Sequence, residues 1–181
     1  SSIKGQIVRA LFHIIAVGQK FNIIFRIYLA YLQIGFFAKM QISELFLHQI
    51  IHHAKIKYPN EACGILAGID NCVLKVYQMT NVNDSPDSYF MNPQEQLRVM
   101  KDIRQLDYEF MGIYHSHPNT DAYPSQRDVD MAYYPEAVYV IISLKDWEKP
   151  DVKAFRIIDG KVKEGSLTQP PKEERVNAVT K

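Results

Sequence analysis

The sequence predicts an α/β fold in which one mixed central β-sheet is flanked by helices. Strand-like runs alternate along the chain with segments whose apolar residues follow helical spacing. The run AVYVIISL at residues 137–144 is apolar throughout, which is typical of a strand covered on both faces. With 181 residues, 47% of them hydrophobic, the chain is long enough for one domain with a sizeable core.

The first predicted elements are a helix and a hairpin. Ser43 is placed to cap a helix whose apolar residues follow helical spacing and which ends before Pro59. Two strand-like runs follow at residues 63–69 and 72–80. Asp70-Asn71 lies between them in the position of a hairpin turn.

The middle of the chain is predicted to continue with a turn, a helix, a strand and a helix. Residues 81–92 are polar and turn-forming, and Asn92-Pro93 opens the second helix. A short apolar strand at residues 110–114 runs into the segment HSHPNTDAYPSQRD. A third helix is expected from Ser125 to a point before Pro135.

The last predicted elements form a second hairpin. The segments 152–158 and 161–164 are expected to pair around Asp159-Gly160. From Gln169 on, the chain is polar and contains prolines, and we expect residues 169–181 to be a disordered tail. The predicted domain therefore covers residues 40–168.

Residues 1–39 form a basic, apolar extension that contains Lys and Arg but no acid. Charges interrupt it, so no uncharged run reaches the roughly 18–20 residues that a membrane-spanning helix needs. A signal peptide fits poorly for the same reason. Two interpretations remain: contact with a membrane surface or a partner groove, or a packing extension or gene-start artefact with Met40 as the natural start.

Charge and cysteine content narrow the choice of partner and compartment. The net charge of +1 gives no electrostatic reason to expect a nucleic-acid partner. Cys63 and Cys72 are the only cysteines, too few for a disulfide framework or a four-cysteine zinc site. Two sparse thiols suit a reducing compartment, and we expect a cytoplasmic protein.

His115 and His117 lie two positions apart at the end of a predicted strand. Residues i and i+2 of a strand point to the same side, so both imidazoles can reach one ion. Pro118 ends the strand, and Asp128 in the first turn of the next helix can supply a third ligand. Two histidines and one carboxylate leave a fourth tetrahedral position for water, as in catalytic rather than structural zinc sites.

Glu61, in the segment PNEACGILAG, is the candidate general base. Amide hydrolysis requires a group that deprotonates water and later protonates the leaving amine. One carboxylate outside the ligand set can do both. The residues that follow Glu61 are small or apolar, so nothing local pairs with it and we expect a raised pKa.

Parts of this pattern also have an ordinary structural interpretation. Ser125 and Asp128 have the spacing of a capping box at a helix N-terminus. The two histidines, taken alone, can be a strand-end pair that is hydrogen-bonded to the backbone.

Two other signals are assigned to structure rather than to chemistry. Cys63 is expected to be a core or site-wall residue. A nucleophilic cysteine needs a nearby group such as an imidazole to lower its pKa, and the histidines here are better suited to binding the metal. Glu44, His48 and His52 recur at four-residue spacing and are expected to form a solvated helix face.

The complete pattern resembles the JAMM motif of the MPN-plus metalloproteases, E…H-[ST]-H-P-x6-S-x-x-D. Every position is met, by Glu61, His115, Ser116, His117, Pro118, Ser125 and Asp128. The resemblance covers residues 40–164 and leaves out the N-terminal extension. It implies the JAMM/MPN fold, a three-layer sandwich similar to that of the cytidine deaminases.

The resemblance also implies a role for each matching residue. His115, His117 and Asp128 would bind one catalytic Zn²⁺, and Glu61 would hold and deprotonate the attacking water. The hydroxyl of Ser125 would help to stabilise the tetrahedral oxyanion, as hydrogen-bond donors at such sites do.

The sequence PNEACGILAG and the short segment after Asp128 most resemble the sequences of the small prokaryotic, Mec-like branch of this family. Members of that branch cleave after the C-terminal Gly-Gly of ubiquitin-like or sulfur-carrier proteins. The resemblance therefore implies a zinc metallopeptidase that cuts a peptide or isopeptide bond at this position. The substrate tail is expected to add as a strand near an exposed sheet edge.

Two alternatives come from other classes of protein. A non-catalytic MPN scaffold would use the same fold for protein contacts, but such relatives typically lack one or more ligands and this sequence lacks none. A zinc hydrolase of small nucleobases or amides on a deaminase-like sheet is disfavoured, because the PCxxC pair of the zinc deaminases is absent.

Overall fold

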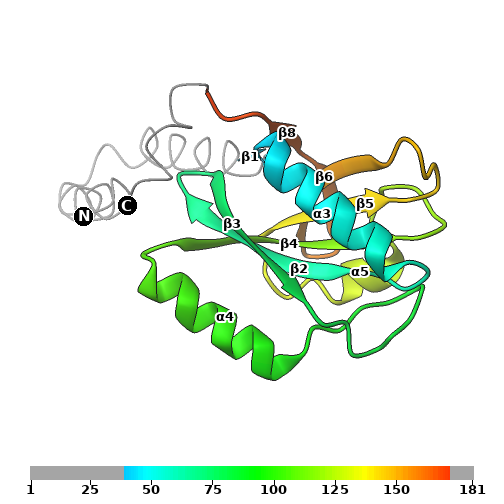
Figure 1. The fold of residues 1–181 in the computed structure, drawn as a ribbon, viewed down its shortest axis with the longest axis horizontal. Helices are drawn as coiled ribbons and strands as arrows, with labels where there is room; N and C mark the ends of the chain where they lie inside the picture. Colours follow the sequence, from blue (N-terminus) through cyan, green and yellow to red (C-terminus); the bar gives the residue numbers. More distant parts are fainter. Residues whose placement is uncertain (1–38, 172–181) are drawn as a thin grey trace, which may run out of the picture. The chain divides into compact units, whose positions relative to one another are not determined.

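The computed structural model describes residues 39–171, which form one mixed β-sheet with helices on both faces (Figure 1). The elements are β1 Lys39–Gln41, α3 Glu44–Lys57, β2 Cys63–Ile69, β3 Cys72–Met79, α4 Pro93–Gln105, β4 Glu109–His117, α5 Gln126–Asp130, β5 Val138–Ser143, β6 Asp151–Ile158, β7 Lys161–Glu164 and β8 Ser166–Thr168.

The sheet has the strand order β7-β6-β5-β4-β2-β3-β1-β8. Strands β4 and β5 are parallel, as are β1 and its two neighbours, whereas the remaining pairs are antiparallel. The predicted class, an α/β fold with a mixed central sheet flanked by helices, is confirmed.

Local chemistry at the element ends agrees with the sequence. The Ser43 side chain accepts a hydrogen bond from the backbone N–H of Phe46 and caps α3, and the Asn92 side chain caps α4. Both residues of the Asp70-Asn71 turn have positive φ, at 51° and 66°, as do Asp159 and Gly160 at 50° and 72°. These values match the two-residue hairpin turns that suit the twist of the flanking strands.

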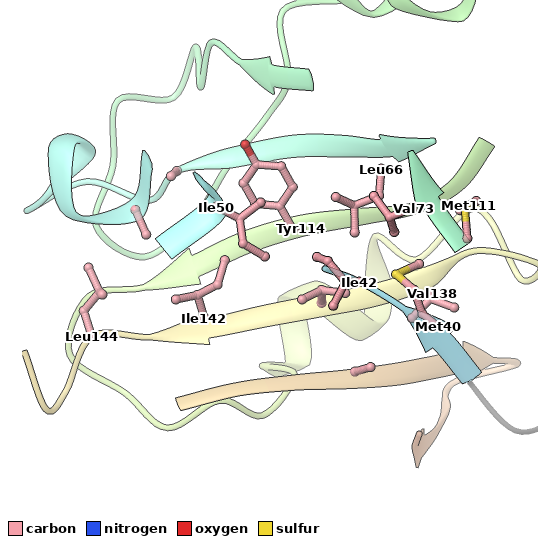
Figure 2. Packing of buried hydrophobic residues seen from close by; sticks show 14 residues of the cluster. Met40, Ile42, Ile50, Leu66, Val73, Met111, Tyr114, Val138, Ile142 and Leu144 are labelled. Carbon is pink, nitrogen blue, oxygen red and sulfur yellow. The ribbon is translucent and has the colours of Figure 1, made fainter. Parts of the chain in front are cut away.

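Two apolar clusters lie on opposite faces of the sheet, and each helix covers one of them. On one face, Ile50 and Ala54 of α3 pack with sheet residues such as Leu66, Tyr114 and Ile142 (Figure 2). On the other face, Ile103 of α4 belongs to a cluster with Cys63, Ile65, Ile113 and Tyr139. The result is a three-layer arrangement of helix, sheet and helix.

The ring of Tyr114 on β4 packs against Gly64 on the neighbouring strand β2. A Cβ added at Gly64 would lie 2.2 Å from the Tyr114 ring and 2.3 Å from the Tyr77 carbonyl oxygen, so only glycine fits there. The Tyr114 hydroxyl is 2.9 Å from Nδ1 of His53, a buried histidine of α3. This hydrogen bond ties α3 to the strand that carries the metal-ligand candidates.

Two predicted elements have other bounds than expected from the sequence. Strand β4 continues past Tyr114 to His117, because β2 pairs with it as far as His115 and β5 as far as His117. Helix α5 ends at Asp130 rather than just before Pro135, and the backbone N–H of Tyr134 instead donates to the Tyr139 hydroxyl.

β1 and β8, the short parallel pair at one edge of the sheet, were not predicted from the sequence. Lys39, which was expected to belong to the N-terminal extension, is the first residue of β1. The interpretations of residues 1–38 and of the tail from residue 172 on concern segments outside the described residues. Within residues 39–171, no helix combines the length and apolar character needed to cross a membrane.

The buried His53 predicts a pH-dependent stability. Burial, with a smaller contribution from Lys57, lowers its pKa from 6.5 to about 4. The unfolded chain therefore takes up this proton first, and the stabilisation present above pH 6.5 is lost as the pH falls towards 4. A gap of this size corresponds to about 3 kcal/mol.

We expect the free energy of unfolding of His53→Gln to depend less on pH than that of the wild type between pH 7 and 4. Gln can still hydrogen-bond to the Tyr114 hydroxyl but does not titrate. Urea unfolding of both proteins at several pH values measures the difference. Parallel pH profiles would contradict the assignment to His53.

Candidate metal centre and active site

The two histidines of the motif lie on one face of β4. Ile113, His115 and His117 alternate with Tyr114 and Ser116, so the imidazoles point to the face covered by α4. Both rings are buried, with 0% of His115 and 5% of His117 exposed. Their Nε2 atoms lie 3.1 Å apart, which confirms that the spacing brings both side chains to one point.

A capping box at the start of α5 holds Asp128 against these histidines. The Ser125 side chain accepts from the backbone N–H of Asp128, and the Asp128 side chain accepts from the backbone N–H of Ser125. Asp128 Oδ1 is 3.2 Å from His115 Nε2, and Oδ2 is 3.3 Å from His117 Nε2. The capping box and the ligand cluster are therefore one arrangement rather than competing interpretations.

The donor set fits a tetrahedral metal ion. One ligand atom from each of His115, His117 and Asp128 lies within 4.8 Å of the others. An ion held at the usual zinc distances of about 2.0–2.1 Å would separate tetrahedral donors by about 3.3 Å. The two histidine nitrogens are 3.1 Å apart, and each has one Asp128 oxygen at a similar distance, Oδ1 at 3.2 Å from His115 and Oδ2 at 3.3 Å from His117. The donors are thus close enough for one ion, and the two-histidine, one-carboxylate set suits zinc.

Hydrogen bonds and burial prepare these side chains to bind a cation. The carbonyl oxygen of Asp121 is 3.0 Å from Nδ1 of His117, which leaves Nε2 free to face the cluster. Burial lowers the pKa of His115 and favours the neutral, metal-binding form. Burial alone would raise the pKa of Asp128, but the histidines and the Ser125 hydroxyl hold it below its usual value, so this carboxylate is ionised.

Glu61 lies beside this cluster, in the segment that leads into β2. Its neighbour Ala62 exchanges two hydrogen bonds with Ser116: the Ala62 N–H donates to Ser116 Oγ at 2.8 Å, and the Ser116 N–H donates to the Ala62 carbonyl at 2.9 Å. These bonds fix the backbone next to Glu61 against the strand that carries both histidines. The charges of His117 and Asp128 act on the Glu61 carboxylate.

The Glu61 carboxyl has the properties expected of a general base. It is 5% exposed, and its Oε2 has no hydrogen-bond partner among the described residues. Burial, reinforced by the negative charges of Asp128 and Asp87, raises its pKa to about 8, although His117 and Arg127 act in the opposite direction. A proton acceptor whose pKa lies near neutrality is well matched to general acid–base work.

Ser125, Cys63 and the polar face of α3 were the other subjects of predictions from the sequence. The Ser125 hydroxyl donates to Asp128 Oδ2 at 2.7 Å. Cys63 is buried, and burial raises its pKa to about 12, which does not suit a thiolate nucleophile. The predicted solvated face of α3, formed by Glu44, His48 and His52, is exposed.

Tyr89 and the side chain of Ser116 have contacts at the site that the sequence did not predict. The Tyr89 ring stacks on His115 with centroids 4.7 Å apart, and its loop is held next to Glu61 by Asn81, whose amide donates to the Glu61 and Ser88 carbonyls. Nothing in the polar segment 81–92 indicates this contact. Ser116 stood in the motif, but its partner Ala62 is 54 residues away in sequence.

Residues 44–158 match the sequence model of a protein family, described as prokaryotic homologs of the JAB domain. This chain belongs to that family. The predicted membership of the JAMM/MPN group is thereby confirmed, and the match spans the cluster and Glu61.

The named relatives of this JAB-domain protein include a CysO-cysteine peptidase and a desampylase. The CysO-cysteine peptidase of Mycobacterium tuberculosis is 38% identical over 120 residues, which cover 65% of this chain and 82% of that protein. The desampylase of Haloferax volcanii is 35% identical over 88 residues, covering 47% of this chain and 63% of that protein.

Solved structures agree with the fold. A protein of Desulfitobacterium hafniense, known from a solution structure, shares 35% of its sequence with this chain at a TM-score of 0.66. The match covers 74% of this chain and 96% of that one. A protein of Salinibacter ruber matches with 26% identity and a TM-score of 0.57, covering 74% of this chain and 94% of that one.

Proposed function

We propose that this JAB-domain protein is a zinc metallopeptidase that hydrolyses the peptide or isopeptide bond after the C-terminal Gly-Gly of a ubiquitin-like or sulfur-carrier protein. The observation that carries the proposal is the buried Glu61 carboxyl, with Oε2 unpaired among the described residues, beside the clustered donors of His115, His117 and Asp128. The names of its relatives support the same class of substrate. We propose that it works in the cytoplasm.

His115, His117 and Asp128 would hold the zinc ion. When bound, the ion supplies Lewis-acid chemistry, which polarises the scissile carbonyl and makes water more acidic. Glu61 accepts a proton from the attacking water, and its raised pKa lets it keep that proton until the C–N bond breaks. It then donates the proton to the leaving amine, so that the carrier carboxylate and a free amine are the products.

Ser125 would donate a hydrogen bond to the oxyanion. In the free protein its hydroxyl donates to Asp128 Oδ2, but the Ser125 backbone N–H also donates to that oxygen at 2.7 Å. The hydroxyl can therefore turn towards substrate without leaving this oxygen of Asp128 unpaired. The stacked ring of Tyr89 and the buried strands around His115 exclude water from the His115 imidazole.

The test is cleavage of the host's own Gly-Gly-terminated carrier proteins extended by one residue, with metal analysis of the same sample. We expect one zinc ion per chain and release of the added residue, detected by mass spectrometry. If a zinc-loaded sample cleaves no such substrate, the proposed substrate class is wrong.

Ser116 is expected to act as a positioning residue for Glu61. Ser116→Ala leaves the buried Ala62 N–H unpaired, so the free energy of unfolding should fall by about 1–3 kcal/mol. We expect the zinc content to stay at one ion and kcat to fall while KM changes little. Ser116→Thr keeps the hydroxyl and should restore kcat; a Thr variant as slow as the Ala variant would contradict the positioning role.

A further inference from the structure

A pocket of about 240 Å³ opens beside the metal-ligand cluster. Asp128 forms part of its wall, and so does Ile113, which lies on the same face of β4 as the two histidines. Tyr89 lines the pocket and stacks on His115 at 4.7 Å. A group bound in this pocket would therefore lie directly next to the reacting atoms.

The pocket is small and mainly apolar. Its walls come from the loop after β3 and from α5 and the turn that follows, and Phe90, Met131 and Tyr133 contribute side chains that are 47%, 41% and 69% exposed. It is smaller than the roughly 300–1,000 Å³ of pockets for drug-sized ligands. This size suits a single amino-acid residue rather than a folded surface.

Arg127 is the cation of this pocket. Its neighbour Asp128, engaged with the two histidines, is the acid that lines it. Among residues 39–171, no carboxylate lies within ion-pair distance of Arg127. The guanidinium charge nevertheless acts on the Glu61 carboxyl. A planar guanidinium without a partner is well suited to a carboxylate, which it can bind with two parallel hydrogen bonds.

We propose that this pocket binds the residue that leaves, as a single amino acid whose α-carboxylate pairs with Arg127 and whose apolar side chain contacts the aromatic wall. This inference rests on the proposed function. In an intact substrate the carrier's own terminal carboxyl is part of the scissile amide. The free α-carboxylate next to that bond therefore belongs to the leaving residue. It is present only when a single residue follows the scissile bond.

The consequence is a preference among conjugates. An amino acid joined through its α-amine keeps a free carboxylate for Arg127. A lysine side chain of a larger protein, joined through an isopeptide bond, presents none. The protein should therefore process carriers that end in one added amino acid faster than carriers attached to protein lysines.

The experiment compares two synthetic peptides, acetyl-Leu-Ala-Gly-Gly-Phe with a free carboxylate and the same peptide as the carboxamide. We expect zinc-loaded wild type to cleave the acid with a kcat/KM about 10-fold above that of the amide. Arg127→Gln should lower the value for the acid about 10-fold more than the value for the amide, because any effect of the lost charge on Glu61 is shared by both peptides. Arg104→Gln on α4, an exposed arginine that does not line the pocket, is the matched control.

Binding measured without turnover separates this inference from the proposed function. Calorimetry on zinc-loaded Glu61→Gln should show an approximately 10-fold lower Kd for the acid than for the amide, and Arg127→Gln in that background should abolish the difference. Equal Kd values for acid and amide, or an equal loss on both peptides with Arg127→Gln, would overturn the inference. Preferential binding of the acid without cleavage by wild type would support the pocket and refute the peptidase.

Discussion

Replacing Glu61 by Gln should remove almost all turnover and leave zinc bound. The change removes the proton acceptor but keeps the size of the side chain, and Glu61 is not one of the three clustered donors. General acid–base groups contribute about 10²- to 10⁴-fold, so we expect kcat to fall by about 10³-fold. The measurements are the cleavage rate of a Gly-Gly-extended carrier and the zinc content of the same preparation.

The zinc content makes this test specific. If Glu61→Gln loses the metal, Glu61 acts as a ligand and not as the base. If it keeps both metal and activity, another group takes the proton. Far-ultraviolet circular dichroism of the variant verifies that the fold is retained, since Gln fills the same buried position.

Replacing His117 by Ala should abolish metal binding and activity together. Two donors remain, and Nδ1 of the lost imidazole no longer binds the Asp121 carbonyl. Loss of a group that only orients a ligand costs about 10- to 100-fold in metal affinity, so loss of the ligand itself should exceed 100-fold. Titration with a competing chelator measures this affinity.

Stability gives a second readout of the same change. Free zinc at 100 times Kd should raise the free energy of unfolding of the wild type by about 2.7 kcal/mol, and should leave His117→Ala almost unchanged. His48→Ala is the matched control, because His48 is exposed on α3 and does not belong to the cluster. Equal zinc stabilisation of His117→Ala and wild type would show that the ion binds elsewhere.

Much of the fold follows from short-range sequence patterns. Ser43 and Asn92 begin their helices, and Asp70-Asn71 and Asp159-Gly160 close their hairpins, because caps and tight turns depend on residues within a few positions. β1 and β8 have no such signal. Each has three residues, too few for a recognisable alternation, and they pair only because the ends of the domain meet.

The cluster of His115, His117 and Asp128 was predictable, because each of its two parts depends on residues close together in sequence. His115 and His117 share one face of a strand, and the Ser125–Asp128 capping box sets the direction of the Asp128 carboxylate. The contact of Tyr89 with His115 was not predictable, since a polar loop of this composition can fold in many ways. The pairing of Ser116 with Ala62 likewise depends on the register between β4 and β2.

The sequence by itself determined which residues form the candidate metal centre, which helix and strand carry them, and that a carboxylate near β2 could serve as a base. The raised pKa of Glu61 was expected from its small and apolar neighbours in sequence. Only the tertiary structure decided that Glu61 is buried beside the cluster, that its pKa rises as far as about 8, and that Arg127 lines an apolar pocket there. The physical reason is that ligand spacing depends on local backbone geometry, whereas a pKa and a pocket depend on what surrounds a group. Those surroundings come from segments that meet only when the sheet assembles.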